Sequence, residues 1–214
     1  MKEKNISVAV IRRLPKYHRY LKEMLDNDIK RISSKELSKM IGFTASQIRQ
    51  DLNNFGGFGQ QGYGYNVEDL YNEIGKILGL TRHYNVAIVG AGNLGQALAN
   101  YSSFDKLGFK LQAMFDVNPK LIGLKINNIK VLDMDEFEDF VKTNNIEIVY
   151  ICTSRDGAQD VADKIQKTGV RAIWNFAPVD LKMKPGVIVE NIHLIDNLLT
   201  VSYFLKDKIE KIEK

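Results

Sequence analysis

The sequence predicts an α/β protein in which a small helical domain precedes a parallel-sheet domain and an apolar C-terminal helix. Three observations predict this. A glycine-rich segment joins an apolar run to a helical pattern at residues 86–100, and apolar runs then alternate with helical patterns toward the C-terminus. Residues 1–84 carry 14 Lys and Arg against 9 Asp and Glu, a net charge of +5, whereas residues 85–214 carry −1. This asymmetry indicates two domains, of which the first faces an anionic partner.

The composition excludes several protein classes. The 214 residues suffice for one large domain or two small ones. No apolar run is long enough to span a bilayer, and the charged N-terminus lacks the apolar core of a signal peptide, so we expect a cytoplasmic protein. The one cysteine, Cys152, excludes an intramolecular disulfide and a cysteine-rich metal site. We expect it to be a buried strand residue, with a redox-active thiol as the alternative.

The N-terminal segment has the pattern of a helix-turn-helix. Apolar residues recur at helical spacing from Val10 to Leu25, and Pro15 interrupts them, so this helix either begins near Pro15 or kinks there. The sequence SSKE at 33–36 is a capping box that opens a second helix, which Gly42 ends. A further capping box, TASQ at 44–47, opens a third helix. The alternative is a helical hairpin with a solvated polar face.

The third helix and the segment after it suit contact with DNA. Gln and Arg side chains pair with adenine and guanine edges in the major groove, and short polar groups suit phosphates. Aromatic residues and glycines alternate over 55–65, which is typical of a β-hairpin wing, although a flexible linker is the alternative. We assign residues 1–66 to a winged-helix DNA-binding domain and 67–84 to a linker helix. The predicted DNA contacts are Ser33, Thr44, Ala45, Ser46, Gln47, Arg49, Gln50, Phe58, Gln60 and Gln61.

The glycine-rich segment has the dinucleotide-binding pattern in its required context. The run Val86–Val89 predicts a buried strand that leads through Gly90, Gly92 and Gly95 into a helix. These glycines permit a tight turn, close approach of a pyrophosphate and close helix–strand packing, respectively. Asp116 ends the next apolar run, where a carboxylate accepts hydrogen bonds from ribose and repels a 2′-phosphate, so NADH and NAD+ are favoured over NADP(H). The alternative is a glycine-rich turn in another α/β protein.

The remaining pattern predicts a Rossmann-like domain over 85–192. Strands are expected at 86–90, 110–116, 147–153, 171–175 and 187–192, and helices at 94–107, 134–144, 156–168 and 194–212. The strand ends should place the glycine loop, Asp116, residues 153–154 and residues 175–178 in one crevice. The helix within 193–214 is apolar on more than one face, so it must be buried on its own sheet or, as in a symmetric dimer, on a second chain.

The order of these elements resembles the Rex family of bacterial redox-sensing repressors over essentially the whole chain. The specific motifs are RLPKYHRYL (13–21), SSKEL (33–37), IRQDLNNFGGFG (48–59), GYGYNV (62–67), VGAGNLG (89–95), FDVNP (115–119) and NFAP (175–178). The resemblance implies a homodimer that binds palindromic operator DNA and releases it when NADH binds, and a terminal helix exchanged between protomers. It implies no enzymatic activity.

The resemblance also implies roles for individual residues. Arg19, Tyr101 and His193 are expected to couple the two domains. Position 193 departs from the family, where an aspartate partner of Arg19 is common, and Asp196 is a candidate substitute. The chain also has Ser154-Arg155 where Val-Pro is common, and Gln60-Gln61 where the wing tip is often basic. The expected cofactor contacts are Gly90, Ala91, Gly92, Asn93, Leu94, Gly95, Tyr101, Asp116, Val117, Thr153, Asn175, Phe176, Ala177 and Pro178.

Two other functions remain open at this point. A NAD-dependent dehydrogenase would use the same cofactor fold, but the chain has no room for a substrate domain. None of its histidines, His18, His83 and His193, belongs to an obvious acid–base constellation. The other alternative is a NAD-binding scaffold that does not bind DNA.

Overall fold

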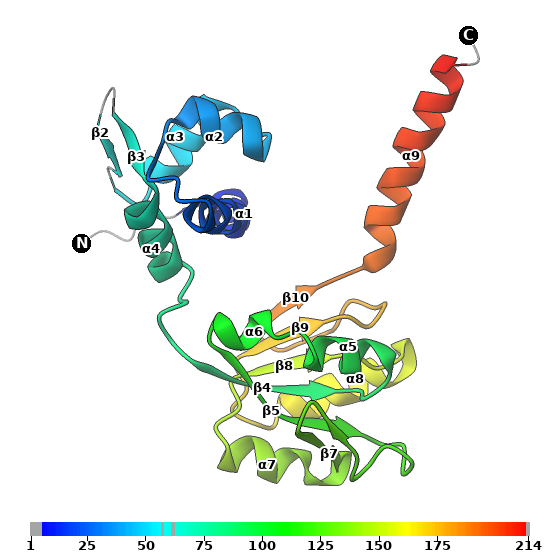
Figure 1. Ribbon diagram of the computed structural model, residues 1–214. Coiled ribbons are helices and arrows are strands. Elements are labelled where there is room, and N and C mark those ends of the chain that lie inside the picture. Colours follow the sequence, from blue (N-terminus) through cyan, green and yellow to red (C-terminus); the bar gives the residue numbers. More distant parts are fainter. Residues whose placement is uncertain (1–5, 57, 61–62, 213–214) are drawn as a thin grey trace. The chain divides into compact units, whose positions relative to one another are not determined.

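The computed structural model describes residues 6–56, 58–60 and 63–212 of the chain. The chain divides into two compact units, Met1–Arg82 and His83–Lys214 (Figure 1). The first unit is mainly helical and the second is an α/β unit around a seven-stranded sheet. The α/β fold class predicted from the sequence is therefore confirmed.

The first unit is a winged helix-turn-helix. α2 and α3 form the helix-turn-helix, and a small antiparallel sheet of order β1-β3-β2 contains the wing hairpin β2–β3. A single core of buried side chains from all four helices holds these elements together. The elements are α1 (Val8–Asp26), β1 (Arg31–Ile32), α2 (Ser34–Ile41), α3 (Ala45–Asn53), β2 (Gly59–Gln60), β3 (Gly64–Asn66) and α4 (Val67–Ile77).

α1 begins before Pro15, so of the two alternatives for this proline the one in which the helix starts near it is wrong. Ser7 caps α1 by accepting a hydrogen bond from the Val10 amide, and Pro15 lies inside the helix. A proline inside a helix costs roughly 3 kcal/mol. The buried stripe that includes Leu14, Tyr17 and Leu21 stabilises by about 1.5–3 kcal/mol for each side chain. Tertiary burial therefore outweighs the local penalty.

The capping sequences set the turn between α2 and α3. The Ser33 hydroxyl accepts from the Glu36 amide at 3.1 Å, while the Glu36 carboxylate accepts from the Ser33 amide at 2.8 Å. Gly42 ends α2 with φ +82°, a conformation that favours glycine. Thr44 then caps α3 by accepting from the Gln47 amide at 3.1 Å. Local hydrogen bonding thus determines both helix boundaries at this turn.

The helix expected to be a linker packs within the first unit. α4 buries Val67, Leu70 and Ile74 in the same core as α1. The ring of His18 on α1 stacks on Tyr71 of α4, with centroids 4.2 Å apart. α4 is therefore held by tertiary contacts rather than standing free before the second unit.

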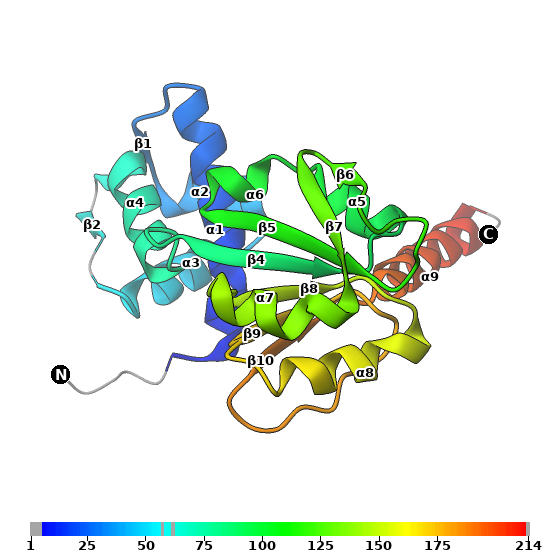
Figure 2. The same ribbon diagram turned by 90° about the horizontal axis from the view of Figure 1, so that it is seen from below.

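The second unit contains a twisted sheet of order β10-β9-β8-β4-β5-β7-β6 (Figure 2). All neighbouring strands are parallel except β6 and β7. The elements are β4 (Tyr84–Val89), α5 (Asn93–Ala99), α6 (Ser103–Lys106), β5 (Phe109–Asp116), β6 (Lys125–Ile126), β7 (Ile129–Asp133), a 3-10 turn (Met134–Glu136), α7 (Phe137–Thr143), β8 (Ile148–Ile151), α8 (Arg155–Ile165), β9 (Ala172–Asn175), β10 (Ile188–Asn191) and α9 (Leu194–Ile212).

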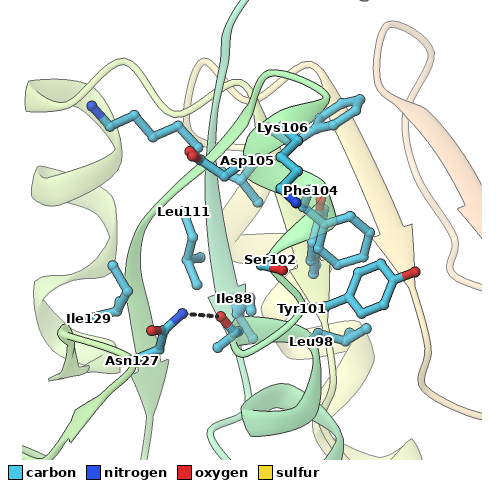
Figure 3. Close-up of a pocket in the computed structure, with 15 residues that line it drawn as sticks. Ile88, Leu98, Tyr101, Ser102, Phe104, Asp105, Lys106, Leu111, Asn127 and Ile129 are labelled. Atoms are coloured by element: carbon cyan, nitrogen blue, oxygen red, sulfur yellow. Dashed lines mark hydrogen bonds between the residues drawn. The ribbon is translucent and has the colours of Figure 1, made fainter. Parts of the chain in front are cut away.

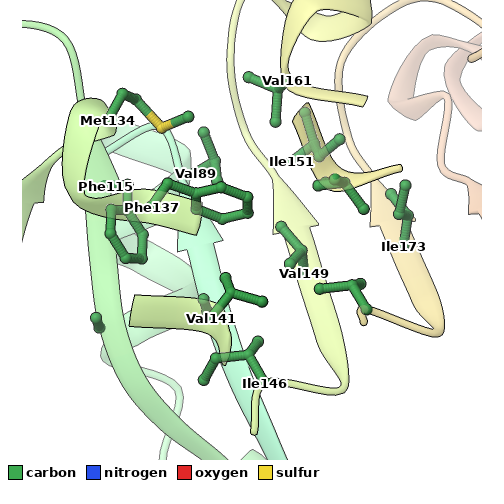
Figure 4. Packing of buried hydrophobic residues seen from close by; sticks show 14 of the residues in the cluster. Val89, Phe115, Met134, Phe137, Val141, Ile146, Val149, Ile151, Val161 and Ile173 are labelled. Atoms are coloured by element: carbon green, nitrogen blue, oxygen red, sulfur yellow. The ribbon is translucent and has the colours of Figure 1, made fainter. Parts of the chain in front are cut away.

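Alternate residues of the central strands face two different cores. Ala87 and Val89 of β4 lie in a cluster with side chains of α7 and α8, such as Phe137 and Val161 (Figure 4). Val86 and Ile88 lie in a second cluster with Ala99 of α5 and partly buried Phe104 of α6. The sheet therefore has helices on both faces, which explains why its strands read as nearly continuous apolar runs.

Two features of this unit differ from the sequence-based expectation. The single helix expected over 94–107 is divided into α5 and α6, and the Asn127 side chain donates to the Ala99 carbonyl at the end of α5 at 3.0 Å. β6 and β7 were not expected. The turn between them contains Asn127 and Asn128, both with positive φ, a conformation that suits a tight hairpin turn.

Candidate functional site

The glycine loop between β4 and α5 is shaped by three positions. Gly90 has φ +100°, and a Cβ there would lie 2.6 Å from the Cys152 carbonyl oxygen. A Cβ on Gly95 would lie 1.9 Å from the Gly90 carbonyl oxygen, whereas a Cβ on Gly92 would meet nothing within 4 Å. The loop therefore packs tightly against its own strand and helix at two glycines and leaves open space at the third.

Asp116 at the end of β5 holds this loop. Its Oδ2 accepts a hydrogen bond from the Ala91 amide at 2.7 Å, and its Oδ1 accepts from the Asn118 amide at 2.8 Å. A carboxylate has about four lone-pair positions, so about two remain for a ligand. The side chain can therefore support the loop and accept hydrogen bonds from a ligand at the same time.

These residues border a cavity of about 510 Å³, which we call the glycine cavity. It brings together five of the expected cofactor contacts: Gly90, Gly92, Asp116, Val117 and Thr153. The sequence reasoning missed the contribution of α8, although a helical spacing of three and four residues could have revealed it. The cavity is lined by Val89, Gly90, Gly92, Asp116, Val117, Met134, Cys152, Thr153, Ser154, Gly157, Asp160, Val161 and Lys164.

Phe176 and Pro178 line a different cavity of about 430 Å³, here named the loop–helix cavity. The expectation that four strand ends line one crevice stays a prediction, because β8 and β9 end side by side with Ile151 opposite Asn175 although the groups beyond them border two cavities. The loop–helix cavity is otherwise formed by the start of α9. Its lining residues are Phe176, Pro178, Ile192, His193, Leu194, Ile195 and Leu198.

Asn175 and Ala177 are buried and hold the loop that presents Phe176. The Asn175 amide nitrogen donates to the Val179 carbonyl at 2.7 Å and to the Asn191 side-chain oxygen at 2.8 Å. Its oxygen accepts from the Ala177 amide at 3.0 Å. Asn175 therefore stabilises the loop, because both the nitrogen and the oxygen of its side-chain amide are hydrogen-bonded within the protein.

His193 has a partner within its own unit. Its Nε2 lies 3.0 Å from Oδ1 of Asp180, on the loop after β9. Asp196 is in the first turn of α9, where its amide donates to the His193 carbonyl at 3.1 Å. Arg19, the expected coupling residue of the first unit, is exposed, with its guanidinium 5.3 Å from the Tyr20 ring centroid.

Tyr101 lies in a third cavity, of about 390 Å³, beside α6 (Figure 3). Its side chain is 57% exposed, and its ring lies 4.9 Å from that of Phe104. The lining is mainly apolar and includes Ile88 and Leu111, which come from the sheet face opposite to Val89. The structure therefore places Tyr101 apart from both cavities described above.

Cys152 borders the glycine cavity but is poorly suited to redox chemistry. Burial raises the pKa of its thiol to about 12, so the reactive thiolate is disfavoured at neutral pH. This result favours the structural interpretation of the cysteine over the redox-active one.

The candidate DNA-binding surface of α3 is polar and largely exposed. Thr44, Ser46 and Gln50 are exposed, and Ala45 and Gln47 are half-buried. Arg49 is also exposed, and its Nη1 donates to the Ser34 hydroxyl at 2.9 Å. Such a surface can bind base edges and phosphates.

The side chains of the other predicted DNA contacts either make contacts within the first unit or are not described by the structure. Ser33 is engaged in the cap of α2, and Phe58 packs partly buried against the core of the first unit. Gln61 lies outside the described residues, and for Gln60 only the backbone is described, in β2.

A buried carboxylate on α3 was missed by the sequence reasoning. Asp51 is only 2% exposed, and its carboxylate accepts from Arg13 Nε, Arg13 Nη2 and the Tyr17 hydroxyl, each at 2.7 Å. Burial, followed by the hydrogen bond to Asp51, raises the pKa of Tyr17, so its hydroxyl remains a donor. The network ties α3 to α1. The signal was an acidic residue on the apolar face of α3, between Ile48 and Leu52.

Within residues 6–56, 58–60 and 63–212 no group of three His, Cys, Asp or Glu residues could hold a metal ion. In the same part of the chain, no helix is both long enough and apolar enough to cross a membrane.

Comparisons with known proteins agree with this two-part architecture. A family model described as "Putative DNA-binding protein N-terminus" matches residues 5–53, and one described as "CoA binding domain" matches residues 81–179. A curated relative, the redox-sensing transcriptional repressor Rex of Clostridioides difficile (strain 630), is 65% identical over 204 residues, which are 95% of this chain and 97% of the relative.

Two solved structures are similar over almost the whole chain. The crystal structure of RSP in complex with β-NAD+ and operator DNA has a TM-score of 0.90 and 59% identity, and the match covers 99% of this chain and 98% of that one. The crystal structure of RSP in complex with β-NADH has a TM-score of 0.90 and 57% identity, with coverage of 99% and 100%.

Proposed function

Because this chain belongs to the Rex family of redox-sensing transcriptional repressors, we propose that it represses transcription by binding operator DNA and senses the NADH/NAD+ ratio. The observation that carries the proposal is near full-length identity to Rex repressors together with a glycine loop and carboxylate suited to a dinucleotide. The curated relatives are named as repressors, not as enzymes. We expect the protein to act in the cytoplasm.

The residues of the glycine cavity fit a dinucleotide. The open space at Gly92 leaves room for a pyrophosphate against the backbone, and the free lone pairs of Asp116 suit ribose hydroxyls. Val117 and Thr153 would lie beside the bound nucleotide. Ala91 would support the loop, because its amide already donates to Asp116, while Asn93 and Leu94 in the first turn of α5 would contribute backbone amides.

The nicotinamide end would bind near Phe176 and Pro178. The lining of the loop–helix cavity is apolar apart from His193, so the positively charged oxidised ring would lose hydration without full compensation. The neutral reduced ring carries no such penalty. This difference supports preferential sensing of NADH, and equal dissociation constants for NADH and NAD+ in a titration of the free protein would contradict it.

α9 supports a dimer. None of its 19 residues, all of which the structure describes, is buried, and its large apolar side chains such as Leu198 and Phe204 are exposed. This result contradicts the alternative that α9 packs on its own sheet. An exposed apolar helix of this length is stabilised by burial on a second surface, and a second copy of the chain would provide one. The proposed dimer also matches a palindromic operator.

NADH can act as a signal only if it binds one conformation better than the other. A ligand with equal affinity for the DNA-bound and DNA-free conformations would shift neither. We therefore propose that NADH binds the DNA-free conformation more tightly, in which case DNA must weaken NADH binding by the same factor.

The decisive experiment measures binding of the full chain to a palindromic operator while NADH and NAD+ are titrated separately. Release by NADH at much lower concentration than by NAD+ is expected. Operator binding that responds to neither nucleotide would refute the sensing function. Loss of operator binding in a Gln47→Ala, Arg49→Ala double variant that still folds would locate the DNA surface on α3, and retained binding would refute that assignment.

A further inference from the structure

We infer that nucleotides carrying an adenosine diphosphate group without nicotinamide, such as ADP and ADP-ribose, bind the glycine cavity and compete with NADH without releasing DNA. The inference rests on the proposed function and concerns the regulation of the same site. It arises because the structure separates the groups suited to adenosine diphosphate from the groups that contact α9.

The glycine cavity contains what an adenosine diphosphate group needs. Gly92 leaves space for the pyrophosphate, Asp116 has lone pairs left for ribose hydroxyls, and Val117 and Met134 provide apolar surface for a base. No residue of α9, a helix described in full, lines this cavity. Binding of this half of the dinucleotide therefore requires neither nicotinamide nor the terminal helix.

The charge of the cavity limits how many phosphates it accepts. Its charged lining residues are Asp116, Asp160 and Lys164, which is one cation against two carboxylates. Phosphates must therefore be bound mainly by backbone amides of the loop, and every further phosphate adds repulsion from the carboxylates. ADP and ADP-ribose should consequently bind better than ATP.

The loop–helix cavity is where a bound dinucleotide would be detected. Phe176 and Pro178 form one side, and Leu194, Ile195 and Leu198 of α9 form the other. ADP ends at the pyrophosphate and ADP-ribose at the second ribose, so neither has a nicotinamide ring to place there. Because a ligand without differential affinity shifts no equilibrium, ADP occupies the site while DNA remains bound. ADP then raises the NADH concentration needed for release.

The test uses the full chain with operator DNA. Calorimetric titration with ADP, ADP-ribose and ATP should show binding of the first two and weaker binding of ATP. ADP alone should leave the operator bound. ADP at ten times its own dissociation constant should raise the NADH concentration for half release about tenfold, as simple competition requires.

Two outcomes would overturn the inference: release of the operator by ADP alone at NADH-like concentrations, or no displacement of NADH by a large excess of ADP. Failure of the proposed function looks different, because NADH itself would then bind without releasing DNA.

Two variants localise the effect. Gly92→Ala should weaken ADP and NADH together. Phe176→Ala should leave ADP affinity within about twofold while weakening NADH about tenfold, as loss of an aromatic contact of 1–2 kcal/mol would do. Equal losses of both ligands in Phe176→Ala would contradict the division between the cavities.

Discussion

The Asp51 carboxylate should be costly to remove from the first unit, because it is buried and is the shared acceptor of Arg13 and Tyr17. Asp51→Ala leaves the Arg13 guanidinium and the Tyr17 hydroxyl without their shared acceptor. Removing one partner of a buried ion pair costs roughly 3–5 kcal/mol. The Arg13 side chain is 20% exposed and can recover some hydration, whereas Tyr17 is fully buried, so we expect a loss of about 2–4 kcal/mol.

The loss can be measured by urea unfolding of the full chain, followed by far-UV circular dichroism. For a domain the size of the first unit, about 1 kcal/mol corresponds to 4–8 °C in melting temperature, so in a thermal scan the variant should melt roughly 8–32 °C lower. The single tryptophan, Trp174, lies in the second unit, so its fluorescence reports on unfolding of that unit. If the two units unfold separately, Asp51→Ala should shift the fluorescence transition of Trp174 less than it shifts the transition followed by circular dichroism.

The matched control is Asp26→Ala, which removes an exposed carboxylate paired with Lys22 on α1. That variant should change the free energy of unfolding by no more than about 0.5 kcal/mol. A double variant, Asp51→Leu with Arg13→Leu, should be less destabilised than Asp51→Leu alone, because no charge is left unpaired. A loss below about 1 kcal/mol for Asp51→Ala, or no coupling in the double variant, would refute the reasoning.

Four further predictions concern the cofactor site, the terminal helix and pH. Gly92→Ala should fold normally but bind NADH at least about tenfold more weakly in calorimetry, because its Cβ would occupy the space expected to hold the pyrophosphate. Gly95→Ala should instead destabilise the second unit, because its Cβ would overlap the Gly90 carbonyl oxygen. Normal NADH binding by Gly92→Ala would contradict this assignment. Asp116→Asn should narrow the preference for NADH over NADPH in the same titration, since the repelling charge is gone, and an unchanged ratio would count against the assigned role. Phe204→Glu should convert the proposed dimer to a monomer in sedimentation experiments, and an unaltered mass would place the interface elsewhere. Burial lowers the pKa of His18 below its ordinary value near 6.5, so the unfolded state binds a proton more readily than the folded state. The contribution of neutral His18 to the free energy of unfolding is therefore complete above pH 6.5 and is lost as the pH falls below 6.5. His18→Phe should reduce this loss between about pH 6.5 and 5, measured as the midpoint of urea unfolding.

Much of the architecture was readable from short stretches of sequence. The caps at Ser33 and Thr44 and the left-handed Gly42 each depend on neighbours within a few residues, and the glycine spacing of the loop after β4 was likewise visible in a short stretch. The exposed apolar face of α9 was likewise visible as a periodic pattern, and that pattern indicated a helix in need of a partner surface. These signals are local because backbone angles and capping hydrogen bonds act within about one helical turn.

The features that the sequence reasoning missed depend on contacts between distant residues. Arg13 and Asp51 are 38 positions apart, and His193 and Asp180 are 13 apart, so no local pattern identifies them as partners. At Pro15 the local pattern was present but did not decide the structure. The burial of α1 outweighs the local preference of proline for a helix start.

The sequence by itself determined that a dinucleotide loop follows a DNA-binding unit and precedes an apolar helix that requires a partner. Only the tertiary structure decided that the glycine loop and the Phe176 loop line separate cavities, of which one includes α9. The physical reason is that a cavity is formed by whichever side chains the packing of strands and helices leaves facing the same space, and spacing along the chain does not specify that packing.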